Sequence, residues 1–539
     1  MNAAKIKQKV RDCLERNRLA EARTLIMTVC KKMPSDADSW HLLGAINGML
    51  GRNEEAESCA RKVIALMPGA VAAYNNLGSA LLAQQKFDDA ESVLGKALEL
   101  NPNDPQALNN SGSLWLQKRE YQKAIDYCRK AVMLKPDYAE AHNNLGSALL
   151  AMDNANEAIS SFERALQLAP DYPDALYNYG QAAYLLGKYD VALSAYGKAL
   201  ELQPGHTATL LGAAEVLKLK GMHDEAANCY QSAINAAPGL TAAYVGYATL
   251  LQKQNRHADA IQMLNRALEV DPQCADALHY SGASMKELGN IDAAAQFFNR
   301  ALDINPELVH SRHMLAAMGL SEPPEKADAR YVAELFDEYA NKFDDHLVVG
   351  LEYRTPDVLK ELVTPLLGDP GPQLDVLDLG CGTGLCAPIF KPWSRSLTGV
   401  DLSRKMVAKA EELGLYDRLI VGDLLEPLSA EESCYDLILA ADVFVYLGKL
   451  DDVVRSCTQS LRQDGVLSFS VELLQEGGHD YILHTGGRYA HTRSYIERLA
   501  DNSLLLIHTA SETVLRKEKG EDVKGIIFIL VKRSQGTES

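Results

Sequence analysis

The sequence predicts two architectures in one chain: an α-solenoid of helical repeats and, after it, an α/β domain with a mainly parallel sheet. The solenoid is predicted by a period of 34 residues that runs through the first three hundred residues. The α/β domain is predicted by short apolar runs between residues 374 and 471 that stop at acidic residues. With 539 residues, the chain is long enough for more than one hydrophobic core.

Proline and alanine mark the period. One proline ends each unit of 34 residues, and an alanine stands twelve residues before each of these prolines. The prolines are Pro34, Pro68, Pro102, Pro136, Pro170, Pro204, Pro238, Pro272 and Pro306. Small residues such as Gly78 and Ala90 let two helices approach closely, and proline ends the second helix because it has no amide hydrogen to donate. The sequence therefore predicts a series of helical hairpins.

This pattern resembles the tetratricopeptide repeat, nine times over, from about Ala3 to Pro306. The resemblance implies a superhelix whose concave groove is lined by the first helix of each hairpin. The first repeat departs from the pattern at Ile6, Lys9 and Val10. We expect it to be an irregular cap.

One position of the predicted groove carries asparagine in four successive repeats: Asn76, Asn110, Asn144 and Asn178. A side-chain amide both donates and accepts hydrogen bonds, so an evenly spaced row can pair with the backbone of an extended peptide. The row is similar to the asparagine ladder in the superhelix of the O-linked N-acetylglucosamine transferases. This interpretation predicts a protein or peptide partner. The alternative is that these amides are solvated or bond to neighbouring turns.

A glycine-rich loop follows the first predicted strand of the α/β domain. The apolar run 374–377 leads to Asp378, and glycines then alternate with other residues at Gly380, Gly382 and Gly384. Glycine lets the backbone take positive φ and lets a ligand lie against the main chain. A dinucleotide fingerprint requires Gly-x-Gly-x-x-Gly, so the third glycine comes one residue too early for a nicotinamide enzyme. The preceding carboxylate suits a cation or an amino group better than a pyrophosphate.

The next three predicted strands also end in acidic residues, Asp401, Asp423 and Asp442. Asp401 is placed to accept hydrogen bonds from ribose hydroxyls, and Asp423 with Leu424 offers an acceptor and an apolar side chain to adenine. This order of strand ends resembles motifs I to IV of the class I S-adenosylmethionine-dependent methyltransferases. The resemblance implies a Rossmann-like domain and S-adenosyl-L-methionine as the cofactor. The implied cofactor-binding residues are Asp378, Gly380, Cys381, Gly382, Gly384, Asp401, Leu402, Asp423, Leu424 and Asp442.

A short proline-rich segment separates the two architectures. We predict a repeat domain over residues 1–320, a stiff linker over 321–326 and a methyltransferase domain over 327–539. Two late apolar runs, 504–515 and 525–532, are predicted to form the closing antiparallel pair of strands.

The first part of the methyltransferase domain is predicted to be helical. Residues 327–351 place their aromatic side chains largely on one helix face. The stretch resembles the amino-terminal cover of small-molecule-type methyltransferases. That resemblance implies that Tyr339, His346 and Arg354 touch the cofactor or the methyl acceptor, whereas ordinary packing is the alternative.

Two segments are candidates for the acceptor side of the site. Val443 and Tyr446 follow the fourth predicted strand, where the acceptor enters in the family. The loop 477–491 mixes glycine, histidine, tyrosine and arginine and is predicted to be a lid or substrate loop, with Arg488 and Tyr489 as contacts. A surface loop held by ordinary hydrogen bonds is the alternative. The Asn/Asp-Pro-Pro-aromatic tetrad and the Pro-Cys dipeptide of DNA-base methylases are missing, which disfavours those two chemistries.

Three histidines are candidates for a general base. His491, His479 and His346 would serve a phenol, thiol or amine acceptor, because histidine titrates near neutral pH. An oxygen or carboxylate acceptor needs only orientation. The histidine spacing is not a metal signature, and no metal is predicted.

Composition limits the class of protein. The net charge of −18 disfavours a general nucleic-acid surface. The ten cysteines show no metal-binding spacing and suit a reducing compartment. We see no apolar stretch near the roughly 20 residues of a membrane span and no signal-peptide pattern. The sequence therefore predicts a soluble, cytoplasmic protein.

The leading hypothesis is a methyltransferase whose repeats capture a protein partner or a carrier-bound substrate. Tethering raises the local concentration of a weakly bound substrate to around millimolar. One alternative is an interaction scaffold whose methyltransferase fold binds a cofactor without catalysis. Another is a small-molecule methyltransferase whose repeats only localise it. The acceptor and the oligomeric state are not predicted.

Overall fold

The chain forms two compact units, Met1–Arg256 and His257–Ser539. This division lies inside the repeat array, so the second unit contains the last repeats together with the α/β domain. The boundaries predicted from the sequence, 1–320, 321–326 and 327–539, were drawn from the repeat period and the proline-rich segment, and they remain a prediction. The computed structural model describes residues 3–340, 343–344, 347, 351, 353–430, 433–518 and 521–533.

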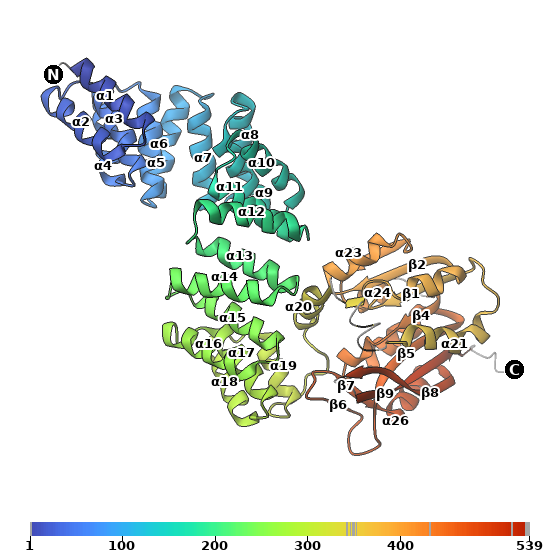
Figure 1. Cartoon of the computed structure of the whole chain (residues 1–539). Helices are drawn as coiled ribbons and strands as arrows, with labels where there is room; N and C mark the ends of the chain where they lie inside the picture. Colours follow the sequence, from blue (N-terminus) through green and yellow to red (C-terminus); the bar gives the residue numbers. More distant parts are fainter. Residues whose placement is uncertain are drawn as a thin grey trace. The chain divides into compact units, whose positions relative to one another are not determined.

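The described part of the first unit consists of helices with the predicted period (Figure 1). Helices α1 to α14 pair in sequence order as hairpins, and α15 is the last helix of the unit. The bounds are α1 Ala3–Glu15, α2 Leu19–Lys32, α3 Ala37–Met49, α4 Asn53–Leu66, α5 Val71–Ala83, α6 Phe87–Leu100, α7 Pro105–Gln117, α8 Tyr121–Leu134, α9 Ala139–Leu150, α10 Ala155–Leu168, α11 Pro173–Leu185, α12 Tyr189–Leu202, α13 Thr207–Leu219, α14 His223–Ala236 and α15 Thr241–Lys253. The predicted α-solenoid is confirmed.

Small residues set the spacing within the hairpins. Gly146 lies so close to α10 that a Cβ there would be 2.6 Å from the ring of Phe162. In a later repeat, Gly212 occupies the position that carries asparagine earlier in the array. A Cβ on it would lie 2.9 Å from the ring of Tyr196. Glycine at this position therefore makes room for a larger aromatic side chain.

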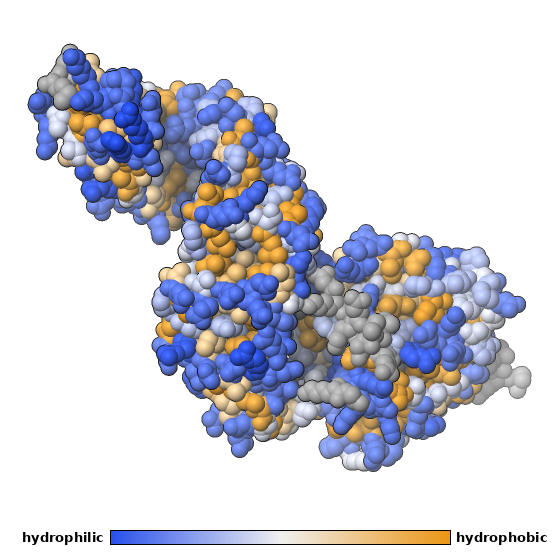
Figure 2. Space-filling model, viewed as in Figure 1, coloured by the Kyte–Doolittle hydropathy of each residue, from blue (hydrophilic) through white to orange (hydrophobic). Residues whose placement is uncertain are grey.

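The surface of the repeats is mainly hydrophilic. On the face shown in Figure 2, hydrophobic residues appear as separate patches among polar ones. Met67, Leu100 and Leu202, near the ends of their helices, are among the exposed apolar residues. Apolar side chains exposed singly are normal in globular proteins. Among the described residues, no helix has the length and hydropathy needed to cross a bilayer.

The second unit begins with four more repeat helices and a short cover. Helix α20 covers the first part of the stretch 327–351 that was predicted to be helical and ends at Tyr339, and a separate helix, α21, begins at Thr355. Much of the stretch between them lies outside the described residues. Pro356 favours that second start, because proline is well suited to the first turn of a helix. The bounds are α16 His257–Val270, α17 Ala275–Glu287, α18 Ile291–Ile304, α19 Val309–Ala317, α20 Ala329–Tyr339 and α21 Thr355–Leu367.

A nine-stranded sheet forms the centre of the α/β domain. Its order is β3-β2-β1-β4-β5-β7-β6, and β9 pairs with both β5 and β8. Strands β1 to β5 pair with one another in parallel, whereas β9 is antiparallel to β5 and β8. The strands are β1 Leu374–Leu379, β2 Ser394–Asp401, β3 Arg418–Val421, β4 Tyr435–Ala440, β5 Leu461–Leu474, β6 Tyr481–Leu483, β7 Tyr489–Thr492, β8 Leu505–Glu518 and β9 Glu521–Lys532. The predicted Rossmann-like fold and closing antiparallel pair are confirmed.

Helices cover both faces of this sheet. Successive residues of β1, Val376 and Leu377, enter different hydrophobic clusters because successive side chains of a strand point to opposite faces. Helices α21 and α22 pack in the cluster of Val376, and α25 and α26 pack in that of Leu377. The remaining bounds are α22 Ala387–Phe390, η3 Lys391–Trp393, α23 Arg404–Glu412, α24 Leu425–Ala430, η4 Phe444–Tyr446, α25 Asp451–Ser460 and α26 Arg493–Asn502.

The predicted loop 477–491 contains two short strands. Strand β7 pairs parallel to β5, and β6 pairs antiparallel to β7. The aromatic residues Tyr481 and Tyr489 favour strand on either side of a turn that contains Gly486 and Gly487. This hairpin signal was present in the sequence, and the prediction of a loop was wrong for these strands.

Candidate active site

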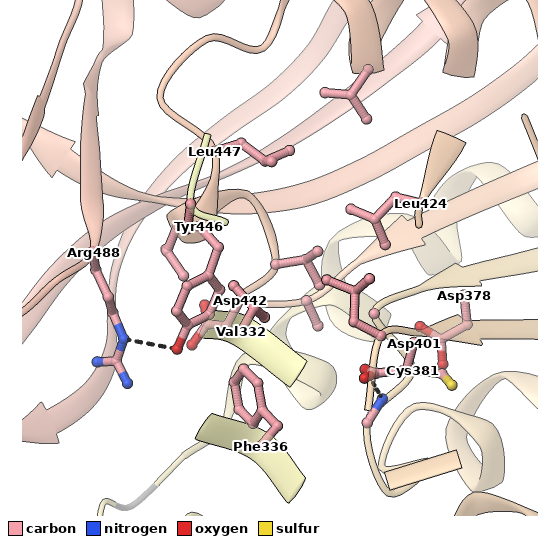
Figure 3. Close-up of a pocket in the computed structure, with 18 of the residues that line it drawn as sticks. Val332, Phe336, Asp378, Cys381, Asp401, Leu424, Asp442, Tyr446, Leu447 and Arg488 are labelled. Atoms are coloured by element: carbon pink, nitrogen blue, oxygen red, sulfur yellow. Dashed lines mark hydrogen bonds between the residues drawn. The ribbon is translucent and has the colours of Figure 1, made fainter. Parts of the chain in front are cut away.

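A cavity of about 300 Å³ opens at the carboxyl ends of β1, β2 and β4, with side chains of α20 in its wall. The strand order runs to β2 and β3 on one side of β1 and to β4 and β5 on the other. The cavity therefore lies at the topological switch point, where open α/β sheets bind ligands. Asp378, Cys381 and Asp401 line one end of the cavity, which we call the glycine-loop end (Figure 3). Tyr446 and Arg488 line another end, which we call the Arg488 end.

The glycine loop has the backbone conformation that its sequence predicts. Gly380, Gly382 and Gly384 have φ of +64°, +53° and +94°. A Cβ on Gly380 would lie 2.4 Å from Cγ2 of Val443, so a larger residue does not fit there. Gly380, Cys381 and Gly382 line the cavity. Gly384 is not among the described lining residues, and a Cβ on it would meet Leu413 of the helix behind the loop at 2.8 Å.

Two carboxylates, the buried Asp378 and the half-buried Asp401, lie at the glycine-loop end. Asp378 is 2% exposed and accepts a hydrogen bond from the Tyr416 hydroxyl at 2.7 Å. Burial, with the nearby charge of Asp401, raises the pKa of Asp378 to about 7, although the bond from Tyr416 acts in the opposite direction. Asp401 accepts hydrogen bonds from the backbone N–H of Gly382 at 3.0 Å and of Ser403 at 2.8 Å. Burial raises the pKa of this carboxyl as well.

Asp423 and Leu424, the residues predicted for adenine, line the cavity together with Leu402, which was predicted only as cofactor-binding. Leu402 and Leu424 are half-buried in its wall. Asp423 accepts hydrogen bonds from the Leu425 N–H at 3.0 Å and from Nζ of Lys326 at 3.2 Å. The apolar side chains and the carboxylate are therefore close together, as the sequence predicted, with a lysine that it did not predict.

The Arg488 end combines aromatic and polar groups. Nε of Arg488 donates a hydrogen bond to the Tyr446 hydroxyl at 3.4 Å (Figure 3). The guanidinium also pairs with Glu518. The ring of Phe336 meets the ring of Tyr446 edge-on, with 5.5 Å between centroids. Val443 lines the cavity here too. Three predicted acceptor-side residues, Val443, Tyr446 and Arg488, are thus brought together.

Asp442 is held by a buried ionic network. Its carboxylate accepts hydrogen bonds from the Ser470 hydroxyl at 2.7 Å and from Arg516 at 3.2 Å. The Arg516 side chain is 2% exposed and also pairs with Glu472 and Glu518. Sequence reasoning missed Arg516, because it lies on β8, far along the chain from the motif that it supports.

The histidines proposed as general bases do not line the cavity in the described residues. His491 is fully buried on β7, where its Nε2 lies 3.0 Å from the carbonyl oxygen of Gly448. Burial lowers its pKa to about 4. His479 is exposed, and His346 lies outside the described residues. The alternation of side chains along β7 turns His491 into the core, so the structure does not support it as a base for an acceptor in this cavity.

Three other predicted contacts lie away from the described cavity wall. Tyr489 is buried and donates a hydrogen bond to the Pro324 carbonyl at 2.7 Å. Tyr339 meets the Phe343 ring edge-on at 5.7 Å. Arg354 is exposed at the start of α21. For these three residues the structure shows local packing or exposure instead of contact with the cavity.

The asparagine row forms hydrogen bonds between repeats. Nδ2 of Asn144 donates to Oδ1 of Asn109 at 2.9 Å, and Nδ2 of Asn178 donates to Oδ1 of Asn143 at 3.0 Å. Nδ2 of Asn110 donates to the Ser79 hydroxyl at 3.0 Å. Likewise, Asn76 lies 3.4 Å from Nδ1 of His41. These contacts match the alternative in which the amides bond to neighbouring repeats.

The cysteines and metal-ligating residues suggest no further chemistry. Cys381 and Cys386 are buried beside the glycine loop, and burial raises the pKa of both thiols. A thiol with a raised pKa is a poor nucleophile. Among the residues that the structure describes, no group of three or more His, Cys, Asp or Glu residues is placed to hold a metal ion.

Comparison with known families separates the same two parts. A methyltransferase-domain model matches residues 377–469, which include the cavity's glycine loop and strand ends. Tetratricopeptide-repeat models match residues 48–90, 75–139, 137–205, 186–241 and 246–308.

The chain is similar to curated methyltransferases over part of its length. Human methyltransferase-like protein 27 is 37% identical over 106 residues, which cover 19% of this chain and 43% of that protein. The malonyl-[acyl-carrier protein] O-methyltransferase of Pectobacterium atrosepticum is 33% identical over 97 residues, 18% of this chain and 38% of that protein. The chain thus spans about two-fifths of the length of these relatives.

The repeats have counterparts among solved structures. One is the APC/C hetero-tetramer Cut9-Hcn1, with 15% identity, a TM-score of 0.44, and coverage of 55% of this chain and 58% of that chain. The family matches and the observed fold agree on both parts of the molecule. This chain therefore combines tetratricopeptide repeats with a carboxyl-terminal methyltransferase domain.

Proposed function

We propose that this chain is an S-adenosyl-L-methionine-dependent O-methyltransferase whose repeats recruit a protein partner or a carrier-bound acceptor. The observation that carries the proposal is the buried carboxylate of Asp378 beside the glycine loop. This carboxylate accepts a hydrogen bond from the Tyr416 hydroxyl, and its pKa is raised to about 7. A neighbouring cation would lower that pKa. The glycine-loop end therefore favours a ligand that brings positive charge.

Residues at several points of the cavity support this cofactor. Asp378 faces the part of the cavity that suits an ammonium or sulfonium group, and a pyrophosphate there would meet two carboxylates. Asp401 is oriented by two backbone N–H groups, and its remaining lone pairs suit ribose hydroxyls. Leu402 and Leu424 supply apolar contact for adenine.

The chain's own contribution to transfer is placement and exclusion of water. S-adenosyl-L-methionine supplies an already activated methyl group, so in-line displacement needs little covalent help from the protein. Near-attack placement contributes up to roughly 7–11 kcal/mol in favourable model systems. Phe336 and Val332 of α20 line the cavity with Tyr446, and these apolar surfaces limit the access of water to the reacting groups.

The Arg488 end favours an oxygen acceptor. A guanidinium donates hydrogen bonds and accepts none, so Arg488 suits a group with oxygen lone pairs. The described cavity wall contains no histidine to remove a proton. An acceptor that is already ionised at neutral pH, such as a carboxylate, needs only orientation. The malonyl-carrier O-methyltransferases among the relatives support this class of acceptor.

The recruiting role rests on the repeats. Tetratricopeptide repeats present an extended surface, and tethering a carrier or partner near a site raises its local concentration to around millimolar. Amide nitrogens of the asparagine row already donate to the preceding repeats, so we expect the partner to contact other side chains of the array as well.

Calorimetric titration with S-adenosyl-L-methionine and with S-adenosyl-L-homocysteine tests the cofactor assignment. We expect micromolar-range binding that Asp401→Ala abolishes. Glu412→Ala, an exposed change on α23, is the matched control and should leave binding intact. A folded protein that binds neither ligand would refute the proposal.

Labelled-methyl transfer tests the acceptor class. The natural chain should transfer tritiated methyl to the malonyl thioester of N-acetylcysteamine, a soluble mimic of a carrier-bound carboxylate, in preference to a catechol. Transfer to the catechol alone would show that the acceptor is a phenol and not a carboxylate. Transfer to a nitrogen or sulfur nucleophile alone would overturn the O-methyltransferase proposal.

A further inference from the structure

Arg488 follows a compact turn between β6 and β7. The N–H of Gly487 donates to the carbonyl of His484 at 2.8 Å, and the N–H of His484 donates to the carbonyl of Arg488 at 2.8 Å. Tyr489, the residue after Arg488, begins β7. The position of the turn therefore decides where the Arg488 guanidinium enters the cavity.

Two helices of the last repeats hold this turn. Nε2 of His313, on α19, lies 2.9 Å from the carbonyl oxygen of Gly487. Nζ of Lys286, on α17, donates to the carbonyl of Thr485 at 3.1 Å. All these residues belong to the second compact unit. The repeats thus contact a catalytic-domain turn directly through its backbone carbonyls.

The fit around Gly487 is tight, and its backbone conformation favours glycine. Its φ is +83°, and a Cβ there would lie 3.1 Å from the Tyr331 hydroxyl and 3.2 Å from Nε2 of His313. The His313 ring is 3% exposed and stacks on the Tyr331 ring, with 4.2 Å between centroids. Because a carbonyl only accepts hydrogen bonds, Nε2 of His313 carries the hydrogen in this contact. The donor is therefore fixed in direction by packing.

The chain on the other side of Arg488 is also fixed. The Tyr489 hydroxyl donates to the Pro324 carbonyl at 2.7 Å. The Glu325 carbonyl accepts from the N–H of Gly448 and of Lys449, both at 2.9 Å. The segment predicted as a linker is therefore bonded to the catalytic domain. Arg488 lies between two anchors, one from the repeats and one from this segment.

We propose that His313 is a positioning residue for the methyl acceptor, which acts through Gly487 on Arg488. The last repeats then form part of the support of the acceptor site, in addition to any role in recruiting a partner. This inference rests on the proposed function, because Arg488 is taken there as a contact of the acceptor oxygen. Lys286 adds a second, more exposed bond to the same turn.

The test uses the full chain with His313→Ala and His313→Gln, because the glutamine amide can donate to the same carbonyl. Phenylglyoxal, which modifies accessible arginines, reports on Arg488 by mass spectrometry. Hydrogen exchange reports on the peptide that contains the turn. We expect His313→Ala to raise both rates several-fold and His313→Gln to restore them. Arg312→Ala, an exposed neighbour on α19, is the matched control.

Affinity for S-adenosyl-L-methionine separates this inference from the proposed function. With the malonyl thioester as acceptor, His313→Ala should raise KM several-fold and leave the Kd for the cofactor unchanged. Equal Arg488 reactivity and equal exchange in natural and His313→Ala chains would overturn the inference, whatever the acceptor. If His313→Ala does not fold, Lys286→Ala supplies the same comparison. Loss of cofactor binding in the natural chain would instead refute the proposed function.

Discussion

Asp378→Asn should stabilise the second unit at high pH. Burial raises the pKa of Asp378 from 3.8 to about 7, so the folded state binds this proton more tightly than the unfolded state. Between these two pH values the free energy of unfolding falls as pH rises, by about 1.4 kcal/mol per pH unit. Over the whole interval this comes to roughly 4 kcal/mol. Above pH 7 the amide should recover at most that amount.

The variant isolates one carboxyl because asparagine keeps the shape and still accepts the hydrogen bond from Tyr416. Urea unfolding can be followed by Trp393 fluorescence, in a background with Trp40→Phe and Trp115→Phe so that only the second unit reports. Between about pH 5.5 and pH 8.5, the difference between variant and natural side chain should grow by about 2 kcal/mol. A difference that is constant across this range would refute the reasoning.

The same carboxyl should make cofactor affinity depend on pH. A cationic group binds the ionised form of Asp378, so below about pH 7 the proton must leave first. The affinity for S-adenosyl-L-methionine should then fall about tenfold per pH unit towards acid. Calorimetry at several pH values checks this, and Asp378→Asn should bind more weakly and without this pH dependence. A flat profile for the natural chain would contradict the assignment.

Three further changes test the packing. Gly487→Ala should destabilise the second unit by about 1–3 kcal/mol in urea unfolding, because φ is +83° and a Cβ meets side chains within 3.2 Å; unchanged stability would count against this fit. Asn144→Ala should cost the first unit about 0.5–1.5 kcal/mol by circular dichroism, since the bond to Asn109 is lost; an equally stable variant would show that this bond contributes nothing. Arg516→Met should lower the free energy of unfolding by about 3–5 kcal/mol, because Glu472 stays buried without its cation. An unshifted melting curve would show that this ion pair does not stabilise the fold.

The repeats and the strand ends were predictable because their signals are local. The spacing of prolines such as Pro68 and Pro102 reports helix length and helix ends within one hairpin. The alternating glycines beginning at Gly380 report a backbone conformation, which needs no distant partner to be recognised. The fold class and the glycine-loop end of the cavity followed from such patterns.

Side-chain direction in short strands was not predictable in the same way. His491 and Arg488 come from one segment rich in polar and glycine residues, yet one is in the core and the other is in the cavity wall. The sequence showed which residue types the segment contains, but not that β7 would pair with β5. Register decides which side chains face the core.

The contacts of the asparagine row were not predictable for a similar reason, and its role as a ligand ladder stays a prediction. A period of 34 residues places Asn110 and Asn144 on equivalent helix positions, and this much was visible. Whether an amide faces a groove or the preceding repeat depends on the packing between hairpins. The partners Asn109 and Asn143 stand immediately before Asn110 and Asn144. The repeated Asn-Asn pairs were the signal that could have revealed the contact.

Strand β1 contains two acids with opposite environments, and the contrast bears on function. Asp375, at its amino end, pairs with Arg395 and Arg462, and the hydrogen bond from Arg395 is the largest influence that lowers its pKa, to about 2. Asp378, three residues later, is buried with a tyrosine hydroxyl, and its pKa rises to about 7. The fold thus neutralises one carboxylate with arginines and leaves the other to cost stability at the end of a cavity. A bound cation would offset that cost, so Asp378 favours a cationic ligand over a purely structural role.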